Sequence, residues 1–442
     1  MISHQENEML GRVGRGTVMG DFLREFWSPA CLSSELEADG APLRLMLFGE
    51  KLIAFRDTNG RVGIFDHRCP HRCASLFFGR NEEGGIRCAY HGWKFDVDGN
   101  CLDQPNLPDK NKYPAGTKAY AYKVTEQAGI VFVYMGKREA APPMPHLEAI
   151  MGEHREGTIA LTQRECNWLQ ALEGDIDTSH LGFLHAGGVD GHQIEESNPN
   201  RYTIINKAPE INVTETDFGT MYSASRDAAP GEEHHRFACF VFPFWVTYPG
   251  GAKLQKSIAL NAWVPIDDYN TMIFNIDRLR GTAEKDELRY KDGSLVEGLA
   301  RPLDYLPTTS DWQGRWRVAM NRSNDYGLDR EWQKNGSFTG IRGIPLQDQA
   351  IQESMEQFLD RTMEHLGSSD RMVMLTRRRL LDAAIAFREN GQLPELVDRP
   401  ELCEGTAGGD VVVPKGTDWL DAYEEVMTAR FGPNRGRREA AE

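Results

Sequence analysis

The 442-residue sequence lacks several features that would assign a chain to a protein class at once. No apolar run reaches the roughly 20 residues that a membrane-spanning helix needs. The N-terminus has no apolar core of the kind found in secretory signals. The formal net charge is −16, which argues against a nucleic-acid surface. We therefore expect a cytoplasmic globular protein with neither a membrane nor a nucleic-acid partner.

Cysteine is sparse as well, since eight residues are too few for a disulfide scaffold. Four of the eight lie between residues 69 and 101, and such clustering indicates metal binding or catalysis. The chain has no plant-type four-cysteine ferredoxin pattern. The segment GRVGRG at 11–16 follows no predicted strand and does not match the dinucleotide-binding fingerprint. We expect NAD(P)H and flavin chemistry to reside on a separate protein.

The hydrophobic pattern of the first third predicts a short helical segment and then a β domain. Residues 9–30 predict a helix that leads into an irregular segment. From 43 to about 135, apolar runs alternate with turn signals such as Asn59-Gly60 and Asp98-Gly99. The proline-rich stretch APPMPHLE at 141–148 is typical of a linker.

Beyond this linker, helical and strand patterns alternate. Helical spacing at 168–180 precedes three long strands at 237–249, 254–266 and 271–278, and a helical pattern returns from about 345 to 390. This predicts an α+β architecture. The expected division is a helical lead-in at 1–42 that packs on the larger domain, a β domain at 43–140, the larger domain at 141–435 and a frayed tail at 436–442.

Two short pairs in the β domain, Cys69-x-His71 and Cys88-x-x-His91, each combine a thiol with an imidazole. In a two-iron, two-sulfide cluster, two cysteines on one iron and two histidines on the other raise the potential to about −150 to +300 mV, from about −400 mV for plant-type clusters. The 16 residues between His71 and Cys88 suffice to lay two such loops side by side. Zinc is the alternative, but a one-residue gap fits structural zinc poorly.

The pattern C-P-H-x16-C-x-Y-H-G-W-x-F resembles the Rieske motif of the ring-hydroxylating oxygenases. Respiratory-chain Rieske proteins add a further cysteine to each loop, whereas this chain has only Cys73 nearby and Tyr90 before His91. The resemblance implies an N-terminal all-β Rieske domain whose four ligands hold a [2Fe-2S] cluster. It further implies a C-terminal catalytic domain with an antiparallel sheet and helices in a START/Bet v1-like helix-grip fold.

A second candidate metal site lies in EGDIDTSHLGFLH, residues 173–185. His180 and His185 are five residues apart, which on a regular helix leaves them about 140° from eclipsed. Ligands that converge at this spacing need a distorted helix or a bulge, which Gly182 would ease. Taken alone, the pair could equally be core or surface histidines. The resemblance favours iron ligands, because the family places D-x-x-H-x4-H about a hundred residues past the cluster.

Two imidazoles and one carboxylate form the facial triad of non-haem Fe(II) oxygenases. The resemblance places the carboxylate at the start of a helix far downstream, often as Asp with Glu four to six residues on. IPLQDQAIQESMEQF matches through Asp348 and Glu353. An aspartate is also common near helix N-termini, because the helix dipole stabilises a negative charge there. The competing carboxylates are Asp311, Asp325 and Asp329.

The resemblance also implies a role for Asp177, three residues before His180. In the family this aspartate is not an iron ligand, but bridges a histidine of the mononuclear site to a Rieske histidine of the neighbouring subunit, where electrons cross. A ligating histidine usually gives its other N–H to a carboxylate, which fixes the tautomer. A helix-surface acid is the alternative, and Glu173 and Asp175 are weaker candidates.

The opening ENEMLGRVGRGTVMGDFLREFWSPA and the block NWLQALEGDIDTSH most resemble the phthalate dioxygenase group, over nearly the whole chain. This implies an oxygenase α subunit with one mononuclear Fe(II), O₂ as co-substrate and a separate NAD(P)H reductase or ferredoxin. Assembly into a head-to-tail homotrimer or a dimer of trimers is implied too. The expected reaction is ring cis-dihydroxylation of a phthalate-like aromatic acid. The alternatives are O-demethylation of a methoxylated lignin-derived or biaryl acid, a pure electron-transfer Rieske protein and a zinc-binding interaction module.

An aromatic acid substrate requires a cation in the pocket, and arginine matches a carboxylate bidentately. Arg236, at the start of RFACFVFPF, is the expected anchor, with Lys207 and Arg226 behind it. Each of the three could equally be a solvated surface charge. The residues expected to line an apolar pocket, or else to form core, are Phe240, Phe242, Trp245 and Trp263.

Overall fold

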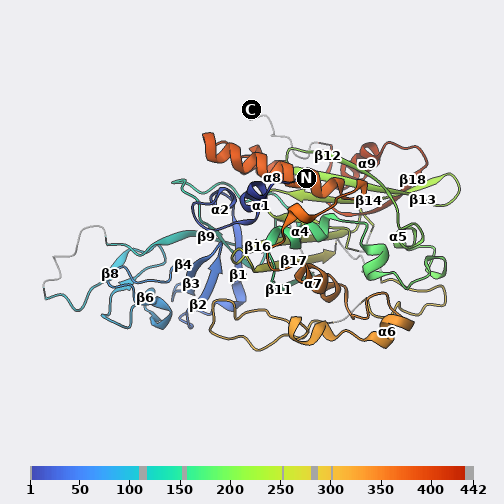
Figure 1. Ribbon diagram of the computed structural model, residues 1–442. Coiled ribbons are helices and arrows are strands. Elements are labelled where there is room, and N and C mark those ends of the chain that lie inside the picture. Colours follow the sequence, from blue (N-terminus) through green and yellow to red (C-terminus); the bar gives the residue numbers. More distant parts are fainter. Residues whose placement is uncertain are drawn as a thin grey trace.

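The computed structural model describes residues 2–108, 117–151, 157–250, 253–279, 287–299 and 302–433. The predicted frayed tail at 436–442 lies outside these residues. A β-rich N-terminal part projects from a larger body in which helices cover a wide sheet (Figure 1). The predicted α+β class is confirmed. No helix in these ranges has both the length and the apolar character that a bilayer crossing requires.

The N-terminal part contains two antiparallel sheets. The six-stranded sheet has the order β1-β10-β9-β4-β3-β2. Its strands are β1 (Ser28–Leu32), β2 (Leu43–Leu47), β3 (Glu50–Arg56), β4 (Val62–Asp66), β9 (Ala121–Gln127) and β10 (Ile130–Tyr134). The four-stranded sheet joins β5 (Arg80–Glu82), β6 (Gly85–Arg87), β7 (Lys94–Phe95) and β8 (Cys101–Asp103). The turns predicted at Asn59-Gly60 and Asp98-Gly99 are confirmed, because they separate β3 from β4 and β7 from β8.

The helix predicted to lead into an irregular segment over residues 9–30 is present only in part. The segment forms two short helices, α1 (His4–Gly11) and α2 (Val18–Leu23), followed by strand β1. Thr17 caps the second helix by accepting a hydrogen bond from the Gly20 amide. A new helix therefore begins at a point where the apolar spacing alone predicts that one helix continues. Strand β1 then pairs with β10 at the edge of the six-stranded sheet.

The larger body is built on an eight-stranded antiparallel sheet of order β11-β17-β16-β15-β14-β13-β12, with β18 paired to β14. Its strands are β11 (Gly157–Arg164), β12 (Glu210–Glu215), β13 (Gly219–Asp227), β14 (Glu232–Val241), β15 (Trp245–Thr247), β16 (Ser257–Pro265), β17 (Thr271–Leu279) and β18 (Gly409–Pro414). The strand predicted at 237–249 is divided into β14 and β15 by a turn at 242–244. The hairpin predicted between the last two strands is confirmed by the pairing of Pro265 with Thr271.

The helical pattern predicted from about 345 to 390 is divided between two helices. Helix α7 (Ile344–Ser354) ends, and α8 (Arg371–Asn390) begins only after two 3₁₀ turns. Glu356 adopts a left-handed φ of 73°, which stops the helix. The backbone that follows is hydrogen-bonded to the start of α4 (Trp168–Ile176), since Asn167 N donates to the Gln357 carbonyl at 2.7 Å.

The remaining helices are α3 (Glu148–Met151), α5 (Asn200–Ile205), α6 (Arg330–Asn335) and α9 (Trp419–Phe431). One large apolar core runs from α1 and α2 through the large sheet to α8. A second, smaller core lies beneath the loops of the four-stranded sheet and includes Cys69, Cys88 and Trp93. The fold therefore places the two candidate metal sites on separate parts of the chain.

Candidate metal centres

The four predicted cluster ligands lie on two neighbouring loops. One loop joins β4 to β5, and its Cys69 amide donates to the Ala74 carbonyl at 2.8 Å. The other joins β6 to β7, and its Cys88 amide donates to the Trp93 carbonyl at 2.8 Å. The structure brings the rings of His71 and His91 to a centroid separation of 4.5 Å. Both thiols are buried, whereas both imidazoles are partly exposed.

This arrangement fits a [2Fe-2S] cluster with thiolates on the inner side and imidazoles at the rim. The buried Nδ1 of His71 has no hydrogen-bond partner among the described residues, so its lone pair is available to a metal. Burial and the neighbouring His91 lower the pKa of His71, which keeps the imidazole in the neutral form that a ligand needs. The ring is held by stacking on Trp93, with centroids 4.4 Å apart.

The second candidate site begins where α4 ends. Residues Leu181–His185 form a π-helical turn, in which the Ala186 amide donates to the carbonyl of Leu181, five residues earlier, at 3.0 Å. This wider turn brings His180 and His185 onto one side, so the predicted helix distortion is confirmed. Gly182 also accommodates a neighbouring side chain. A Cβ there would lie 2.9 Å from Lys207 Cγ, so the glycine makes room for the lysine stem.

Asp348 completes a group of three convergent donors. The Nε2 atoms of His180 and His185 are 3.1 Å apart, and Asp348 Oδ1 lies 3.7 Å and 3.3 Å from them respectively. The three ligating atoms all lie within 4.8 Å of one another. Two imidazoles and one carboxylate on the same side of a small space are the donor set of a non-haem iron centre.

None of the competing carboxylates joins this group in the described parts of the chain. Asp329 caps α6 by accepting from the Trp332 amide at 2.9 Å. Asp311 accepts from Thr309 Oγ1 at 2.9 Å, and Asp325 lies in the 3₁₀ turn Arg322–Gly327. Glu353 accepts from the Glu165 amide at 2.9 Å and so ties α7 to the end of β11.

Each histidine has a partner on its other nitrogen. Asp177 Oδ2 lies 3.3 Å from His180 Nδ1, and Asp177 Oδ1 accepts from the Ser179 amide at 2.7 Å. Gln347 Oε1 lies 2.8 Å from His185 Nδ1, and Gln347 Nε2 donates to the Ile341 carbonyl at 2.7 Å. These contacts orient both rings so that Nε2 faces Asp348. Gln347 was not predicted, because nothing in the sequence marks it apart from its place beside Asp348.

The charges at the site favour a cation. Burial would raise the pKa of Asp348, but the fields of His185 and His180 hold it at about 2, so the carboxylate is ionised. Burial would lower the pKa of His180, but the hydrogen bond to Asp177 and the charge of Asp348 raise it above its ordinary value. Metal binding therefore displaces a proton from His180 and leaves the carboxylate of Asp348 unchanged.

The two weaker acidic candidates serve other contacts. Glu173 forms a bidentate pair with Arg377, at 2.6 Å and 2.8 Å. Asp175 Oδ2 accepts from Asn261 Nδ2 at 2.7 Å and from Trp263 Nε1 at 2.6 Å.

Arg236 lies deep in the larger body and is only 5% exposed. Its Nη1 donates to both carboxylate oxygens of Asp410, at 3.0 Å and 2.9 Å, and to Asn200 Oδ1 at 2.7 Å. Its Nη2 donates to the Pro249 carbonyl at 3.1 Å. These partners already occupy the guanidinium of Arg236. A role for Arg236 in holding a substrate carboxylate stays a prediction.

Lys207 borders the π-helical turn, and Arg226 contacts the residue before Lys207. Lys207 is half-buried, its stem passes over Gly182, and its Nζ lies 4.9 Å from the Phe183 ring centroid. Arg226 Nε donates to the carbonyl of Asn206, the residue before Lys207, at 2.8 Å. Burial and the nearby Arg236 lower the pKa of Arg226 to about 10. Within the described ranges, neither cation is paired with a carboxylate. The four aromatic residues expected in a pocket, Phe240, Phe242, Trp245 and Trp263, are buried in the core.

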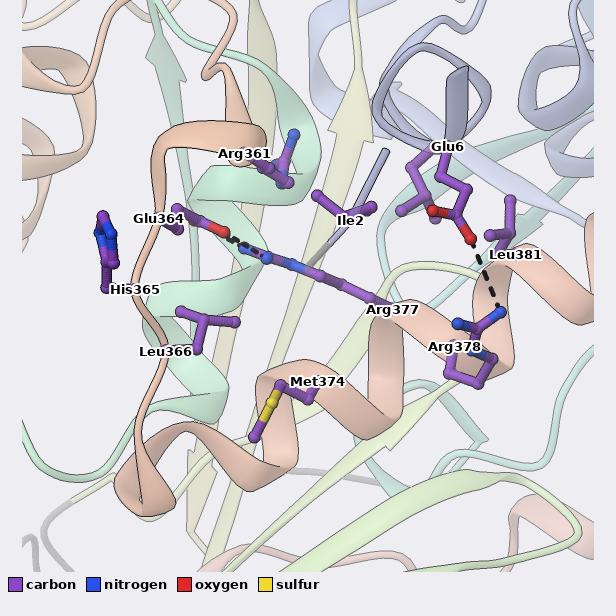
Figure 2. Close-up of a pocket in the computed structure, with 11 residues that line it drawn as sticks. Ile2, Glu6, Arg361, Glu364, His365, Leu366, Met374, Arg377, Arg378 and Leu381 are labelled. Atoms are coloured by element: carbon purple, nitrogen blue, oxygen red, sulfur yellow. Dashed lines mark hydrogen bonds and ion pairs between the residues drawn. The ribbon is translucent and has the colours of Figure 1, made fainter. Parts of the chain in front are cut away.

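A cavity of about 540 Å³ lies away from both centres, between α1, α8 and the segment 361–366 (Figure 2). Apolar side chains such as Leu10 and Leu381 share its wall with ion pairs, and Figure 2 shows the bonds from Glu364 to Arg377 and from Glu6 to Arg378. No histidine or aspartate of the three-residue group lines it.

Comparison with known proteins finds relatives along nearly the whole chain. Residues 26–114 match the Rieske [2Fe-2S] domain, and residues 133–432 match the family described as LigXa C-terminal domain like. The oxygenase subunit of 3-chlorobenzoate-3,4-dioxygenase from Comamonas testosteroni is 45% identical over 430 residues, which cover 96% of this chain and 98% of that protein. The oxygenase subunit of phthalate 4,5-dioxygenase from Pseudomonas putida is 37% identical, with 95% and 94% covered.

A further relative is the oxygenase subunit of 5,5'-dehydrodivanillate O-demethylase from Sphingobium sp., which is 30% identical, with 97% and 90% covered. Among solved structures, NdmA of Pseudomonas putida CBB5 with caffeine superposes with a TM-score of 0.60 at 17% identity, covering 91% of this chain and 99% of that one. At this identity the likeness concerns the fold alone.

Proposed function

The chain belongs to the Rieske non-haem iron oxygenases as an oxygenase subunit, and from this we propose that it oxidises an aromatic carboxylic acid by ring cis-dihydroxylation. Its cofactors are one Rieske [2Fe-2S] cluster and one mononuclear iron. The proposal extends to the residues that hold these groups, to the substrate class and to the assembly.

The convergence of His180, His185 and Asp348 is the observation that carries the proposal. These three side chains would hold the iron, and Cys69, His71, Cys88 and His91 would hold the cluster. The bound iron supplies open coordination positions at which O₂ is activated. The residues around the iron would fix the two imidazoles, supply one negative charge and leave the opposite side free for O₂ and substrate.

Electron transfer would run through Asp177. Its carboxylate contacts His180 Nδ1 and is 29% exposed, so it can also meet a group outside the chain. We propose that this group is a Rieske histidine of a neighbouring copy, in a head-to-tail homotrimer or a dimer of trimers. Electrons would reach the cluster from a separate NAD(P)H-dependent reductase or ferredoxin.

An acid substrate is supported by Lys207, which borders the π-helical turn, and by Arg226, which bonds to the residue before Lys207. Burying an arginine such as Arg226 without a carboxylate partner is costly, and a bound anion would offset that cost. Lys207 lies next to it and borders the turn that carries His180 and His185. The two most similar relatives described above are named for 3-chlorobenzoate and phthalate, both aromatic carboxylates.

The experiment is turnover by the purified chain with a compatible reductase, NADH and a panel of benzoate, 3-chlorobenzoate, phthalate, isophthalate and vanillate. A product that gains two oxygens and two hydrogens supports ring cis-dihydroxylation. NADH consumption without product from any acid contradicts the proposed substrate class.

O-demethylation is the second candidate, supported by the O-demethylase relative that aligns over 97% of this chain. The same cations would hold the carboxylate of a methoxylated acid, with the methoxy group toward the iron. Loss of CH₂ from vanillate, with release of formaldehyde, would favour this reaction over dihydroxylation.

The role of Lys207 is tested by Lys207→Gln, which keeps the stem and removes the charge. A hydrogen bond to a charged group contributes about 1.5–3 kcal/mol, so KM for the acid should rise roughly 10–100-fold while kcat changes little. The control is Lys137→Gln, an exposed lysine that follows β10 in the N-terminal part. An unchanged KM in Lys207→Gln would exclude this lysine as an anchor.

A further inference from the structure

Asp175 is an acidic side chain that has no role in the reaction as proposed above. It lies in the last turn of α4, five residues before His180, and is half-buried. Its Oδ2 accepts two hydrogen bonds from β16, from Asn261 Nδ2 and Trp263 Nε1. Its Oδ1 has no partner among the described residues, so this oxygen is the one free to carry and donate a proton.

The groups that hold Asp175 are uncharged. Asn261 Oδ1 accepts from Asn275 Nδ2 at 2.7 Å, and Asn275 Nδ2 also donates to Tyr248 Oη at 2.8 Å. The carboxyl group therefore lies in a network of neutral amides, an indole and a phenol, and no cation of the described residues forms an ion pair with it.

Four charged or titratable groups face Asp175 from the elements around it: Asp348 on α7, Arg164 on β11, Tyr248 after β15 and His180 beyond α4. Burial raises the pKa of Asp175 to about 6. The hydrogen bonds from Asn261 and Trp263 lower this pKa, whereas the charge of Asp348 raises it further. Asp175 lies in the last turn of α4, five residues before His180, and its charge is one of those that act on His180. An acid of this kind exchanges its proton near neutral pH.

Both candidate reactions need protons at this site. Ring cis-dihydroxylation combines the arene with O₂, two electrons and two protons to give the dihydrodiol. O-demethylation combines the methyl ether with O₂, two electrons and two protons to give the phenol, formaldehyde and water. The electrons come from the reductase, but the protons must be delivered by the protein or by water.

The other groups at the site are poor donors. Asp348 is ionised, and His180 and His185 would be occupied as ligands. Burial raises the pKa of Tyr248 well above its ordinary value.

We propose that Asp175 is the proton donor of this oxygenase: its Oδ1–H bond breaks as an O–H bond forms on the oxygen being reduced, directly or through one water. The resulting carboxylate is stabilised by Asn261 and Trp263 and regains its proton from solvent through the exposed side. The inference rests on the proposed iron site and applies to either reaction.

The first test compares Asp175→Asn with the wild type under two supplies of reductant. With reductase, NADH and O₂, loss of a general acid should lower product formation by roughly 10²–10⁴-fold. Hydrogen peroxide brings the same two electrons and two protons with the oxygen, so product formation driven by peroxide should stay within a few-fold of the wild type. Equal losses in both assays, or no loss in either, would overturn the proposal.

Asp382→Asn is the matched control, because Asp382 is an exposed acid of α8. Iron content and the Rieske absorption spectrum should match the wild type in both variants. An error in the proposed substrate class would show separately, because the wild type would then consume NADH without forming a product from any acid.

The second test reads the proton itself and requires no turnover. Infrared difference spectra of the iron-loaded protein should show a protonated-carboxyl C=O band that disappears as the pH rises through about 6. The band should be missing in Asp175→Asn. A wild-type protein whose spectrum lacks the band below this pH would overturn the assignment.

The third test moves the proton affinity without removing the acid. Asn261→Ala and Trp263→Phe each remove one donor to Oδ2 and so destabilise the carboxylate. A hydrogen bond to a charged group corresponds to about one pH unit or more, so both the infrared titration and the alkaline fall of the rate should move upward by about that much. A purely structural Asp175 would leave both positions unchanged.

Discussion

Replacing Glu173 with glutamine should destabilise the larger domain more than any other single loss of charge described above. Glu173 lies on α4, four residues before Asp177, and its side chain is 10% exposed. It faces two buried arginines, with Arg377 Nε at 2.6 Å and Arg361 Nε at 3.5 Å. The arginines are 7% and 0% exposed, so neither can turn to bulk water when the carboxylate is removed.

The magnitude follows from the geometry. At an effective dielectric constant of about 20 and charge centres roughly 4 Å apart, each pair contributes about 4 kcal/mol of attraction. Glutamine also avoids the desolvation cost of a buried carboxylate, which offsets part of the loss. Breaking a buried pair by removing one partner typically costs about 3–5 kcal/mol, and we expect Glu173→Gln to fall in this range.

The assay is urea unfolding of the iron-loaded protein, followed by tryptophan fluorescence. Glu364→Gln is the matched control, because Glu364 also pairs with Arg377 but is 18% exposed and does not contact Arg361 in the salt bridges described. It should cost about 1–2 kcal/mol. Glu215→Gln, which breaks the pair of a 55% exposed glutamate with Arg379, should cost less than about 1 kcal/mol.

The pH dependence gives an independent check. The two arginines overcome the effect of burial and lower the pKa of Glu173 from its ordinary value of 4.5. The stabilisation is therefore fully present above pH 4.5 and is lost as the pH falls through the lowered pKa. The stability difference between wild type and Glu173→Gln should shrink below pH 4.5. A loss under about 1 kcal/mol at pH 7, or a difference that persists in acid, would refute the reasoning.

Three further predictions concern the mononuclear centre. Gln347→Ala removes the partner of His185 Nδ1, and loss of such a supporting contact should weaken iron binding about 10–100-fold, measured by chelator competition; an unchanged affinity would contradict the role of Gln347. Asp348→Ala should abolish retention of the mononuclear iron while the Rieske absorption spectrum stays unchanged, and two irons per chain instead of three by metal analysis would confirm it. The pKa of His180 lies above its ordinary value of 6.5, so protons should begin to displace the iron already above pH 6.5 as the pH falls. The loss of iron is measured as the iron content after dialysis at pH values from 8 to 5.5.

The parts of this architecture that depend on local pattern were predictable. Turn signals located the hairpins at Asn59-Gly60 and Asp98-Gly99, because glycine supplies the positive φ that those turns require. The five-residue spacing of His180 and His185 predicted a distorted helix, and the π-helical turn is that distortion. The placement of Asp348 was predictable only through the family resemblance, since 163 residues separate it from His185.

The errors arose where distant contacts override local periodicity. The apolar spacing past residue 354 continues that of a helix, but the backbone there bonds to Asn167 at the start of α4. The sequence did not indicate the partner of Arg236, because Asp410 is 174 residues away. The contacts of Asp175 were not predicted either, because its two donors lie on β16.

The pairing of β1 with β10 has a consequence for recombining domains between relatives. Strand β10 is fully buried and has β1 as its outer neighbour, although about 100 residues separate the two in sequence. A transplanted fragment that begins at residue 43 would leave the backbone amides and carbonyls along this edge of β10 without partners, or would place them against a foreign strand. The β2–β3 turn also bonds to the other part of the chain, because the Phe48 amide donates to the Pro265 carbonyl at 3.0 Å. Functional chimeras should therefore need crossover points before residue 28 and after residue 134. The β16–β17 turn lies outside this fragment and should be replaced together with it, so that it comes from the same parent as the β2–β3 turn.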